Sequence, residues 1–353
     1  MIPVEDRLSA LPDSILCHIL SFLPTKHSAA TSILSKRWNS LWLSVFTLDF
    51  VVNNLSDTET FDRVILLRDI KVPIQTLRVK RNVMVKPPEY PNSINPLIMV
   101  AIERGLETLE LDMVRASNIF SCKTLTVIKL KNVRIVRNPP PINISPLKTL
   151  HLDNVRFVGD TDIITFLLNF PTLEELQTCY VVVEEFTPET AINKCLPNLK
   201  RATISYTDVI PLFMLSRALI LSIKLHTWSQ KIPTFHSLTQ LELFLELDSK
   251  KKWKWMLDML HQSPKLQHIL ISEDNWQNPD AVPKCFQSQL KTLLFRNYRG
   301  RKCELQFAEY VMRNSKLLRT LTIRSSCSMD SEAKSEVLKK LSLCPRSCDL
   351  IFD

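Results

Sequence analysis

Hydrophobic and polar residues alternate in short runs along most of the chain, and the runs share the form L-x-x-L-x-L. Clear examples read LETLEL, LTVIKL, LKTLHL, LTQLEL and LRTLTI. Within L-x-L the two leucines point to one face of a short strand, and the residue between them points to the other. We identify eleven such runs, with central positions at Leu77, Leu109, Ile128, Leu150, Leu176, Ala202, Ile223, Leu241, Ile269, Leu293 and Leu321.

The spacing of these runs favours a repeat protein. Successive centres lie 18 to 32 residues apart, which brackets the period of about 20 to 29 residues of leucine-rich repeats. One repeat cannot bury its own leucines, so several must stack to form a core. The predicted fold class is α/β: an irregular leucine-rich-repeat solenoid with parallel strands inside and helices and loops outside. Thr178 and Ala202 replace leucines in two of the repeats.

The residue between the two leucines of each strand is expected on the inner face of the solenoid. That face then carries a mixture of charged, polar and apolar side chains, which suits contact with a partner protein. The candidate target-binding residues are Glu110, Lys129, His151, Gln177, Lys224 and Glu242. The same face is expected to display Thr203, Leu270, Leu294 and Thr322.

Residues 6–42 lack the repeat and have the pattern of short helices. Leu16, Ile19, Leu20 and Leu23 follow at helical spacing and form one apolar stripe on a helix that ends near Pro24. A segment of about 40 residues seldom sustains an independent core, so this one is expected to need a partner surface.

A later helix is expected in the same segment, with Ser35 as its cap and Trp38, Leu41 and Trp42 on one face. Two blocks, LPDSILCHILSFLPTK and TSILSKRWNSLW, closely resemble the F-box, a small three-helix domain. In that family the F-box docks on a Skp-family adaptor, which links it to a cullin scaffold and hence to a ubiquitin-conjugating enzyme. The resemblance implies that ten residues contact the adaptor or hold the fold that presents the contact: Leu11, Pro12, Ile15, Leu16, Ile19, Leu20, Leu34, Ser35, Trp38 and Leu41.

Residues 282–323, followed by VLKKLSLCPRSCDLIF, resemble the FBD module found after leucine-rich repeats in many plant F-box proteins. Pro345 and Cys348 lie closer together than is usual in that module. The helix candidate ELQFAEYVMRNSKLL is expected to turn Phe307, Val311 and Leu317 toward the repeats as an end cap. The expected domains are the F-box at 1–48, a linker or first repeat cap at 49–72, leucine-rich repeats at 73–280 and the FBD-like region at 281–353.

Composition narrows the functional classes. Hydrophobic residues make up 45% and charged residues 23% of the 353 residues, as in ordinary globular proteins. Only three glycines occur, far apart, so no phosphate-binding glycine loop is expected. Cysteines and histidines show no metal-ligand spacing, and no cofactor or catalytic residue is expected. Neither a secretory signal nor a membrane span is found in the sequence, so the chain is expected in the cytosol or nucleus.

The net charge of +9 is unevenly placed, because residues 280–353 carry six of the excess positive charges. The run KKKWKW, which begins at Lys250, also interleaves cations with aromatic residues, as surfaces for single-stranded nucleic acid do. A solvated helix with Trp253 packed inward explains this run better.

The sequence favours the substrate-receptor subunit of a cullin-based ubiquitin ligase, which holds a target protein on its repeats and has no catalytic residue of its own. Two alternatives stay open: an adaptor-bound interaction protein that does not promote ubiquitylation and, less favoured, a nucleic-acid-binding protein.

Overall fold

The computed structural model describes residues 8, 10–52, 57–81, 94–112, 119, 122–135, 147–158, 163–184, 194–207, 209–225, 231–245, 249–272, 281–326, 331–344 and 348–353. The chain divides into two compact units. Unit 1 comprises Met1–Phe170 with Val182–Glu185, and unit 2 comprises Pro171–Val181 with Phe186–Asp353. Each unit is described by itself.

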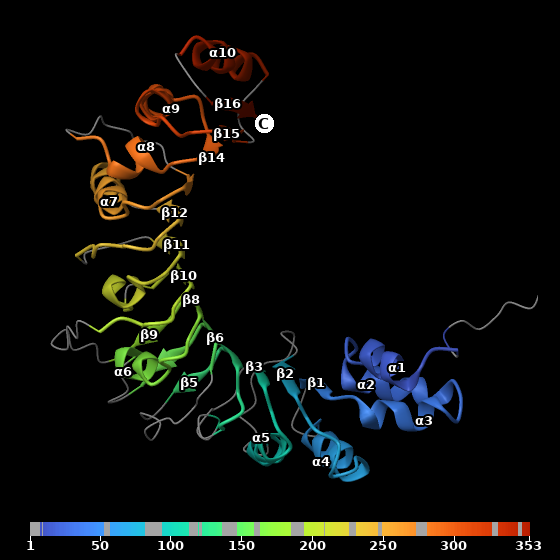
Figure 1. The fold of residues 1–353 in the computed structure, drawn as a ribbon. Coiled ribbons are helices and arrows are strands. Elements are labelled where there is room, and N and C mark those ends of the chain that lie inside the picture. Colours follow the sequence, from blue (N-terminus) through green and yellow to red (C-terminus); the bar gives the residue numbers. More distant parts are fainter. Residues whose placement is uncertain are drawn as a thin grey trace, which may run out of the picture. The chain divides into compact units, whose positions relative to one another are not determined.

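Short helices begin unit 1, as the sequence predicts (Figure 1). Prolines at positions 12 and 24 directly precede the first two of them, where proline's fixed φ suits entry into a helix. Ser35 does not act as the predicted cap, because Arg37 occupies the N-cap position of α3 and no side chain caps that helix. The helices are α1 (Asp13–Leu20), α2 (Thr25–Ala30), the 3-10 helix η1 (Thr31–Ile33), α3 (Trp38–Leu41) and the 3-10 helix η2 (Trp42–Ser44).

A parallel sheet follows in unit 1, and its strands pair in chain order. The predicted centres Leu77, Leu109, Ile128 and Leu150 stand directly opposite one another. The strands are β1 (Thr47–Val52), β2 (Thr76–Arg81), β3 (Thr108–Asp112), β4 (Val127–Lys131) and β6 (Thr149–Asp153). The other elements of unit 1 are helices α4 (Asp57–Leu67), α5 (Ile94–Glu103) and α6 (Ile163–Leu168) and short paired strands β5 (Arg134–Ile135), β7 (Arg156–Phe157) and β9 (Val182–Val183).

Unit 2 continues the same architecture, with parallel strands on one side and helices α7, α8 and α9 on the other (Figure 1). Its strands are β8 (Glu175–Cys179), β10 (Arg201–Ser205), β11 (Ile220–Leu225), β12 (Gln240–Leu245), β13 (His268–Ile271), β14 (Thr292–Tyr298), β15 (Thr320–Ser325) and β16 (Asp349–Phe352). Its helices are the 3-10 helix η4 (Leu212–Leu215), α7 (Ser249–His261), α8 (Lys284–Ser288), α9 (Lys302–Asn314) and α10 (Ser331–Ser342).

The predicted fold class is therefore confirmed: short helices, in the segment that resembles the F-box, precede parallel strands of leucine-rich-repeat type. One of the eleven predicted strand centres is wrong. Leu221, not Ile223, stands opposite Ala202 and Leu241. The segment predicted as a linker or first repeat cap, 49–72, contains strand and helix: β1 places Asp49 opposite Arg78 and Phe50 opposite Val79.

Leucine burial explains why these strands stack. In the strands of both units, side chains alternate between buried and partly exposed positions, and the leucines of the motif are 0 to 2% exposed in examples such as Leu109, Leu111, Leu150 and Leu152. Burial of one such side chain contributes about 1.5 to 3 kcal/mol. Each repeat supplies one wall of this core and depends on its neighbours for the next.

The FBD-like end is partly as predicted. Phe307 and Val311 of α9 are fully buried. The predicted inward position of Leu317 is wrong, because its side chain is 51% exposed. Leu318 is buried instead. The last strand, β16, pairs in parallel with β15. Residues 345–347 and the side chain of Trp253 lie outside the described part of the chain.

In the described ranges, no helix is both long enough and apolar enough to cross a lipid bilayer.

Candidate functional site

The F-box helices form a small core of their own. Leu16 and Leu20 of α1 pack with Trp38 and Leu41 of α3 and with Val45. These five side chains are at most 7% exposed, and Leu16 is fully buried. They therefore hold the helices together. They are not available for direct contact with a partner in this arrangement.

A second set of apolar side chains on the same helices faces solvent. Ile15 and Ile19 of α1 and Phe22, in the turn that directly follows α1, are spaced at i, i+4 and i+7; we call these three residues the α1 stripe. They are 45%, 38% and 73% exposed. Ile33 and Leu34, at the end of η1, are even more exposed on average, at 87% and 64%. Clustered exposed apolar residues of this kind mark interaction surfaces.

A charged contact at the surface joins the start of α1 to the residue that precedes α3. The Nε of Arg37 donates a 2.8 Å hydrogen bond to Oδ1 of Asp13, at the start of α1. Nη2 of Arg37 also donates to the Leu11 carbonyl, at 2.5 Å. Nearby, burial and the Asp13 charge raise the pKa of the Cys17 thiol, which lies against the Leu41 carbonyl. These contacts link α1 to the segment around α3.

The ten residues predicted for adaptor contact thus divide into two groups. The core group is Leu16, Leu20, Trp38 and Leu41. The solvent-exposed group is Pro12, Ile15, Ile19, Leu34 and Ser35. Leu11 is half-buried and belongs to neither group. The sequence reasoning missed Phe22 and Ile33. Phe22 was detectable, because it stands seven residues after Ile15, which is the spacing of residues on one helix face.

Charged residues on the strand face of unit 1 pair with one another across the sheet. Asp49, Arg78, Glu110 and Lys129 stand in register on β1 to β4. Arg78 lies 3.9 Å from Asp49 and 3.5 Å from Glu110, and Lys129 donates a 2.9 Å hydrogen bond to Glu110. Burial alone raises the pKa of Glu110, but the Lys129 hydrogen bond and the charges of Lys129 and Arg78 lower it overall. His151 continues this row on β6.

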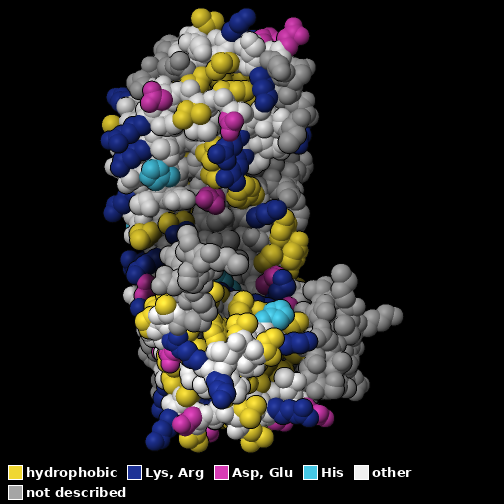
Figure 2. Space-filling model, turned by 90° about the vertical axis from the view of Figure 1, so that its right-hand side faces the viewer, with side chains coloured by type: hydrophobic (Ala, Val, Ile, Leu, Met, Phe, Trp, Pro, Cys, Tyr) yellow, Lys and Arg dark blue, Asp and Glu magenta, His cyan; other side chains and the backbone are white. Residues whose placement is uncertain are grey.

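The strand face of unit 2 is less ionic. The row there runs from Gln177 through Thr203, Ser222 and Glu242 to the apolar Leu270 and on to Leu294 and Thr322. Figure 2 shows hydrophobic, basic and acidic side chains interspersed on this face. The predicted position Lys224 lies two residues beyond the row, because the centre of its repeat is Leu221.

Lys224 takes part in a different arrangement at the ends of the strands. Its Nζ lies 4.8 Å from the ring centroid of Tyr206, and the ring of Tyr206 stacks on that of Tyr180 with centroids 4.6 Å apart. Both tyrosines have positive φ, near 50°, where most residues other than glycine are strained. The stacking and the cation over the ring offset part of this strain.

Histidine, cysteine and acidic side chains do not gather into a metal-ligand cluster anywhere in the described part of the chain. The buried thiol of Cys285 has its pKa raised to about 12 by burial, although backbone N–H groups lower it in part. A thiol in that state is a poor nucleophile at neutral pH.

Family models match both ends of the chain. The F-box domain model matches residues 8–48, and the FBD model matches residues 277–323. The predicted resemblance to both families is thereby confirmed.

Relatives cover nearly the whole chain. An FBD-associated F-box protein of Arabidopsis thaliana (At5g56370) is 27% identical over 98% of this chain and 100% of its own length. An F-box/FBD/LRR-repeat protein of the same plant (At3g52680) is 28% identical over 96% of this chain and 88% of its own length. Over nearly its whole length the chain is thus similar to Arabidopsis proteins that are named for F-box, FBD and leucine-rich-repeat elements.

Proposed function

We propose that this chain is the substrate-recognition subunit of a Skp-cullin-F-box ubiquitin ligase. The observation that carries the proposal is the α1 stripe: three exposed apolar side chains at helical spacing, two on α1 and one in the turn after it, inside the segment that matches the F-box domain. The F-box binds Skp-family adaptors as a family property, and the names of the relatives combine F-box, FBD and leucine-rich-repeat elements.

The division between core and exposed residues supports adaptor binding through the exposed group. Each apolar side chain fully buried on binding contributes about 1.5 to 3 kcal/mol before the entropic costs of association. Five exposed apolar side chains are available for such burial: those of the α1 stripe and those of Ile33 and Leu34. Leu16, Leu20, Trp38 and Leu41 act indirectly, since they pack beneath the exposed set and hold its helices together.

The strand face of unit 2 is the better candidate for target binding. In unit 1 the row formed by Asp49, Arg78, Glu110 and Lys129 is largely neutralised by its own ion pairs. A partner must break or desolvate those pairs to use them. In unit 2 the row includes Leu270 and Leu294 beside polar residues, so it offers apolar area with a polar surround, as protein interfaces do.

The mechanism is proximity. The F-box end anchors the chain to the adaptor and cullin, while the repeats hold the target. Lysines of the target then reach a high effective concentration near the activated ubiquitin, without any covalent step on this chain. No catalytic group is required of the receptor.

Capture of a purified Skp-family adaptor by the full-length chain tests the proposal. The variant Ile15→Asp/Ile19→Asp is expected to lose capture, because it places two charges in the apolar contact. Leu66→Asp is the matched control: Leu66 is 83% exposed on α4, outside the F-box helices, and this variant is expected to retain capture.

Circular dichroism melting of all three proteins shows whether each remains folded. Equal capture by the folded double variant and the wild type overturns the proposed surface. Partner abundance in cells distinguishes the ligase from an interaction protein that does not promote ubiquitylation: disruption of the α1 stripe raises the level of a bound target only if the complex ubiquitylates it.

A further inference from the structure

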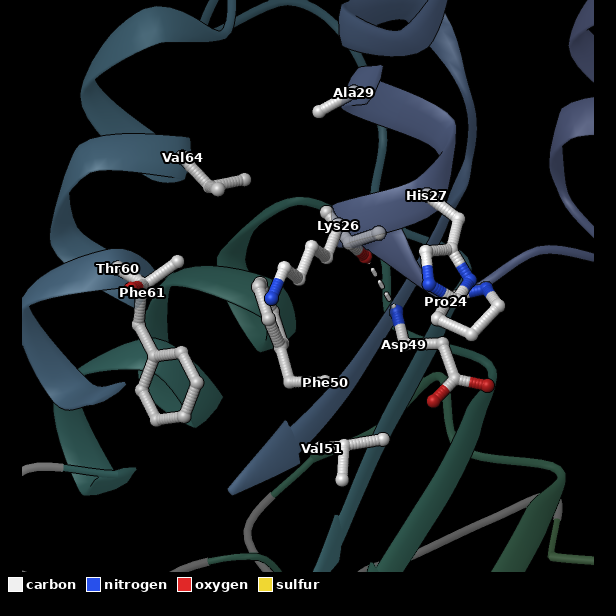
Figure 3. A pocket seen from close by; sticks show the side chains of 11 residues that line it. Pro24, Lys26, His27, Ala29, Asp49, Phe50, Val51, Thr60, Phe61 and Val64 are labelled. Atoms are coloured by element: carbon white, nitrogen blue, oxygen red, sulfur yellow. Dashed lines mark hydrogen bonds between the residues drawn. The ribbon is translucent and has the colours of Figure 1, made fainter. Parts of the chain in front are cut away.

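A pocket of about 470 Å³ lies within unit 1, between helix α2, strand β1 and helix α4 (Figure 3). Its volume falls in the range of about 300 to 1,000 Å³ that is typical of small-molecule sites. None of the three α1 stripe residues lines it. The pocket is therefore separate from the surface proposed for the adaptor.

The deep wall of the pocket is apolar and aromatic. Phe50 of β1 and Phe61 of α4 have ring centroids 4.7 Å apart, with the rings tilted by 57°. Val64 of α4 and Ala29 of α2 also line the pocket, each from its own helix (Figure 3). Phe50, Phe61 and Val64 are 2 to 7% exposed, so the wall is rigidly packed from behind. Such a wall suits a flat apolar body of one or two rings.

The open edge of β1 supplies backbone groups to the same pocket. β1 pairs with β2 on one side, and on the other side the amide of Asp49 donates a 2.8 Å hydrogen bond to Oγ1 of Thr25 (Figure 3). Backbone groups of alternate residues point to the same edge of a strand. The N–H of Val51, two residues on, therefore points to this edge and is placed to donate to a ligand.

The charge at the pocket favours an anion. The side chain of Lys26 extends across the pocket toward Phe50 (Figure 3), and the ammonium group has no ion-pair partner among the described residues. Asp49 is the acidic residue of the lining, and its Oδ2 lies 3.9 Å from Arg78 and 3.4 Å from Lys80. These two cations neutralise the carboxylate on the strand side. The charge that remains for a ligand is positive.

We propose that this pocket binds a small amphipathic carboxylate. Its apolar body lies against Phe50, Phe61 and Val64, and its carboxylate accepts hydrogen bonds from the Lys26 ammonium and the Val51 N–H. A ligand in this position touches α2, β1 and α4 at once, so it ties the F-box helices to the first strand. Its binding stabilises unit 1, since it favours the state in which the three elements are together.

The test uses the purified full-length chain and three probes that share one ring system: naphthalene-2-carboxylate, naphthalene-2-methanol and naphthalene-2-methylamine. Isothermal titration calorimetry measures the affinity of each. The proposal expects saturable binding of the carboxylate below about 1 mM, with the alcohol about tenfold weaker and the protonated amine weaker still. Equal or tighter binding of the amine overturns it, as does absence of saturable carboxylate binding.

Variants locate the site. Lys26→Met removes the charge but keeps the length of the side chain, and it is expected to reduce carboxylate affinity about tenfold to the level of the alcohol. Lys36→Met is the matched control, because Lys36 is exposed on the F-box segment and does not line the pocket; its affinity is expected to equal that of the wild type. Unchanged affinity of Lys26→Met overturns the assignment.

Ala29→Leu fills the pocket and is expected to abolish binding of all three probes while the melting temperature stays within a few degrees. If this variant fails to fold, the Lys26→Met comparison still decides the question. The test requires no adaptor, so its outcome is independent of the capture experiment on the α1 stripe.

Discussion

Ile15 and Leu16 are neighbours on α1, yet the side chain of Ile15 is 45% exposed whereas that of Leu16 is fully buried. Consecutive residues of a helix point about 100° apart, so one helix presents its core face and its solvent face within a single step. The apolar residues of α1 cover both faces. This relationship separates the residues that build the F-box from those proposed to bind the adaptor.

The two residues are expected to respond differently to truncation. Leu16→Ala leaves a cavity among Leu20, Trp38 and Leu41 and is expected to destabilise the F-box by about 2 to 5 kcal/mol. Ile15→Ala removes a side chain that has solvent on one side and is expected to cost less than about 1 kcal/mol. Urea unfolding followed by tryptophan fluorescence measures both, since Trp38 and Trp42 lie in the F-box. Equal destabilisation by the two variants contradicts the assignment of faces.

The ion pair between Glu110 and Lys129 predicts a dependence of stability on pH. The pKa of Glu110 is lowered in the folded chain, whereas the unfolded chain has a value near 4.5. The stabilisation is therefore fully present above pH 4.5 and is lost as the pH falls through the folded-state pKa. Because the pair is partly exposed, its contribution at pH 7 is expected to be at most about 1 kcal/mol.

Lys129→Gln tests this expectation. Its loss of stability, relative to wild type, is expected at pH 7 and is expected to be smaller at pH 3, because Glu110 gains a proton as the pH falls below 4.5 through its lowered folded-state pKa. Lys123→Gln is the control, because Lys123 is exposed and outside the ion-pair row. A deficit of Lys129→Gln that is the same at both pH values assigns the effect to packing and contradicts the electrostatic account.

Thr178 occupies a leucine position of its repeat and is fully buried. Its Oγ1 has no hydrogen-bond partner among the described residues, and an unsatisfied buried hydroxyl costs about 1 to 3 kcal/mol. Thr178→Val is therefore expected to stabilise unit 2 by about 1 kcal/mol. Thr203→Val, on the partly exposed face of the next strand, is expected to change stability by less than about 0.5 kcal/mol. Chemical denaturation of both variants provides the comparison, and a destabilised Thr178→Val variant refutes the prediction.

Cys285 is expected to resist alkylation in the folded chain. Its side chain is fully buried, and burial raises its pKa to about 12. At pH 8 the thiolate fraction is then about one in ten thousand, and only the thiolate reacts. Cys195 is partly exposed and is expected to react with iodoacetamide under the same conditions. Peptide mass spectrometry before and after addition of urea checks this, and rapid labelling of Cys285 without urea contradicts it.

The stacking of repeats was predictable from sequence because leucines at a period of two define a buried strand face. The register of β11 was not, because two overlapping frames fit its residues. Ile220, Ile223 and Leu225 match I-x-x-I-x-L, whereas the frame that the structure adopts begins at Ala218 and centres on Leu221. Both frames bury the same strand face, so only the packing of Ala218 and its neighbours selects between them.

Strand β1 was not identified as a repeat strand from the sequence, for a related reason. Its motif is Val45, Leu48 and Phe50, with one leucine in place of three, although all three side chains are buried like those of the other repeats. Any bulky apolar residue can fill the core at these positions. A search for leucines therefore underestimates the extent of the repeats.

The candidate adaptor surface was predictable as a segment but not residue by residue. The apolar positions of α1 span more than half of the helix circumference, and the sequence pattern joins Leu16, Ile19, Leu20 and Leu23 in one stripe. The contact of α1 with α3 decides which of them are covered. That contact depends on Trp38 and Leu41, about twenty residues away, and on the Arg37–Asp13 ion pair.

Direct measurement of adaptor affinity tests the central claim most directly. Calorimetric titration of a Skp-family adaptor into the wild type and into Ile15→Ala, Ile19→Ala and Phe22→Ala is expected to show losses of about 5- to 100-fold per variant, equivalent to about 1 to 3 kcal/mol, with unchanged melting temperatures. Wild-type affinity in all three folded variants, or no binding by the wild type itself, contradicts the claim that the α1 stripe binds the adaptor.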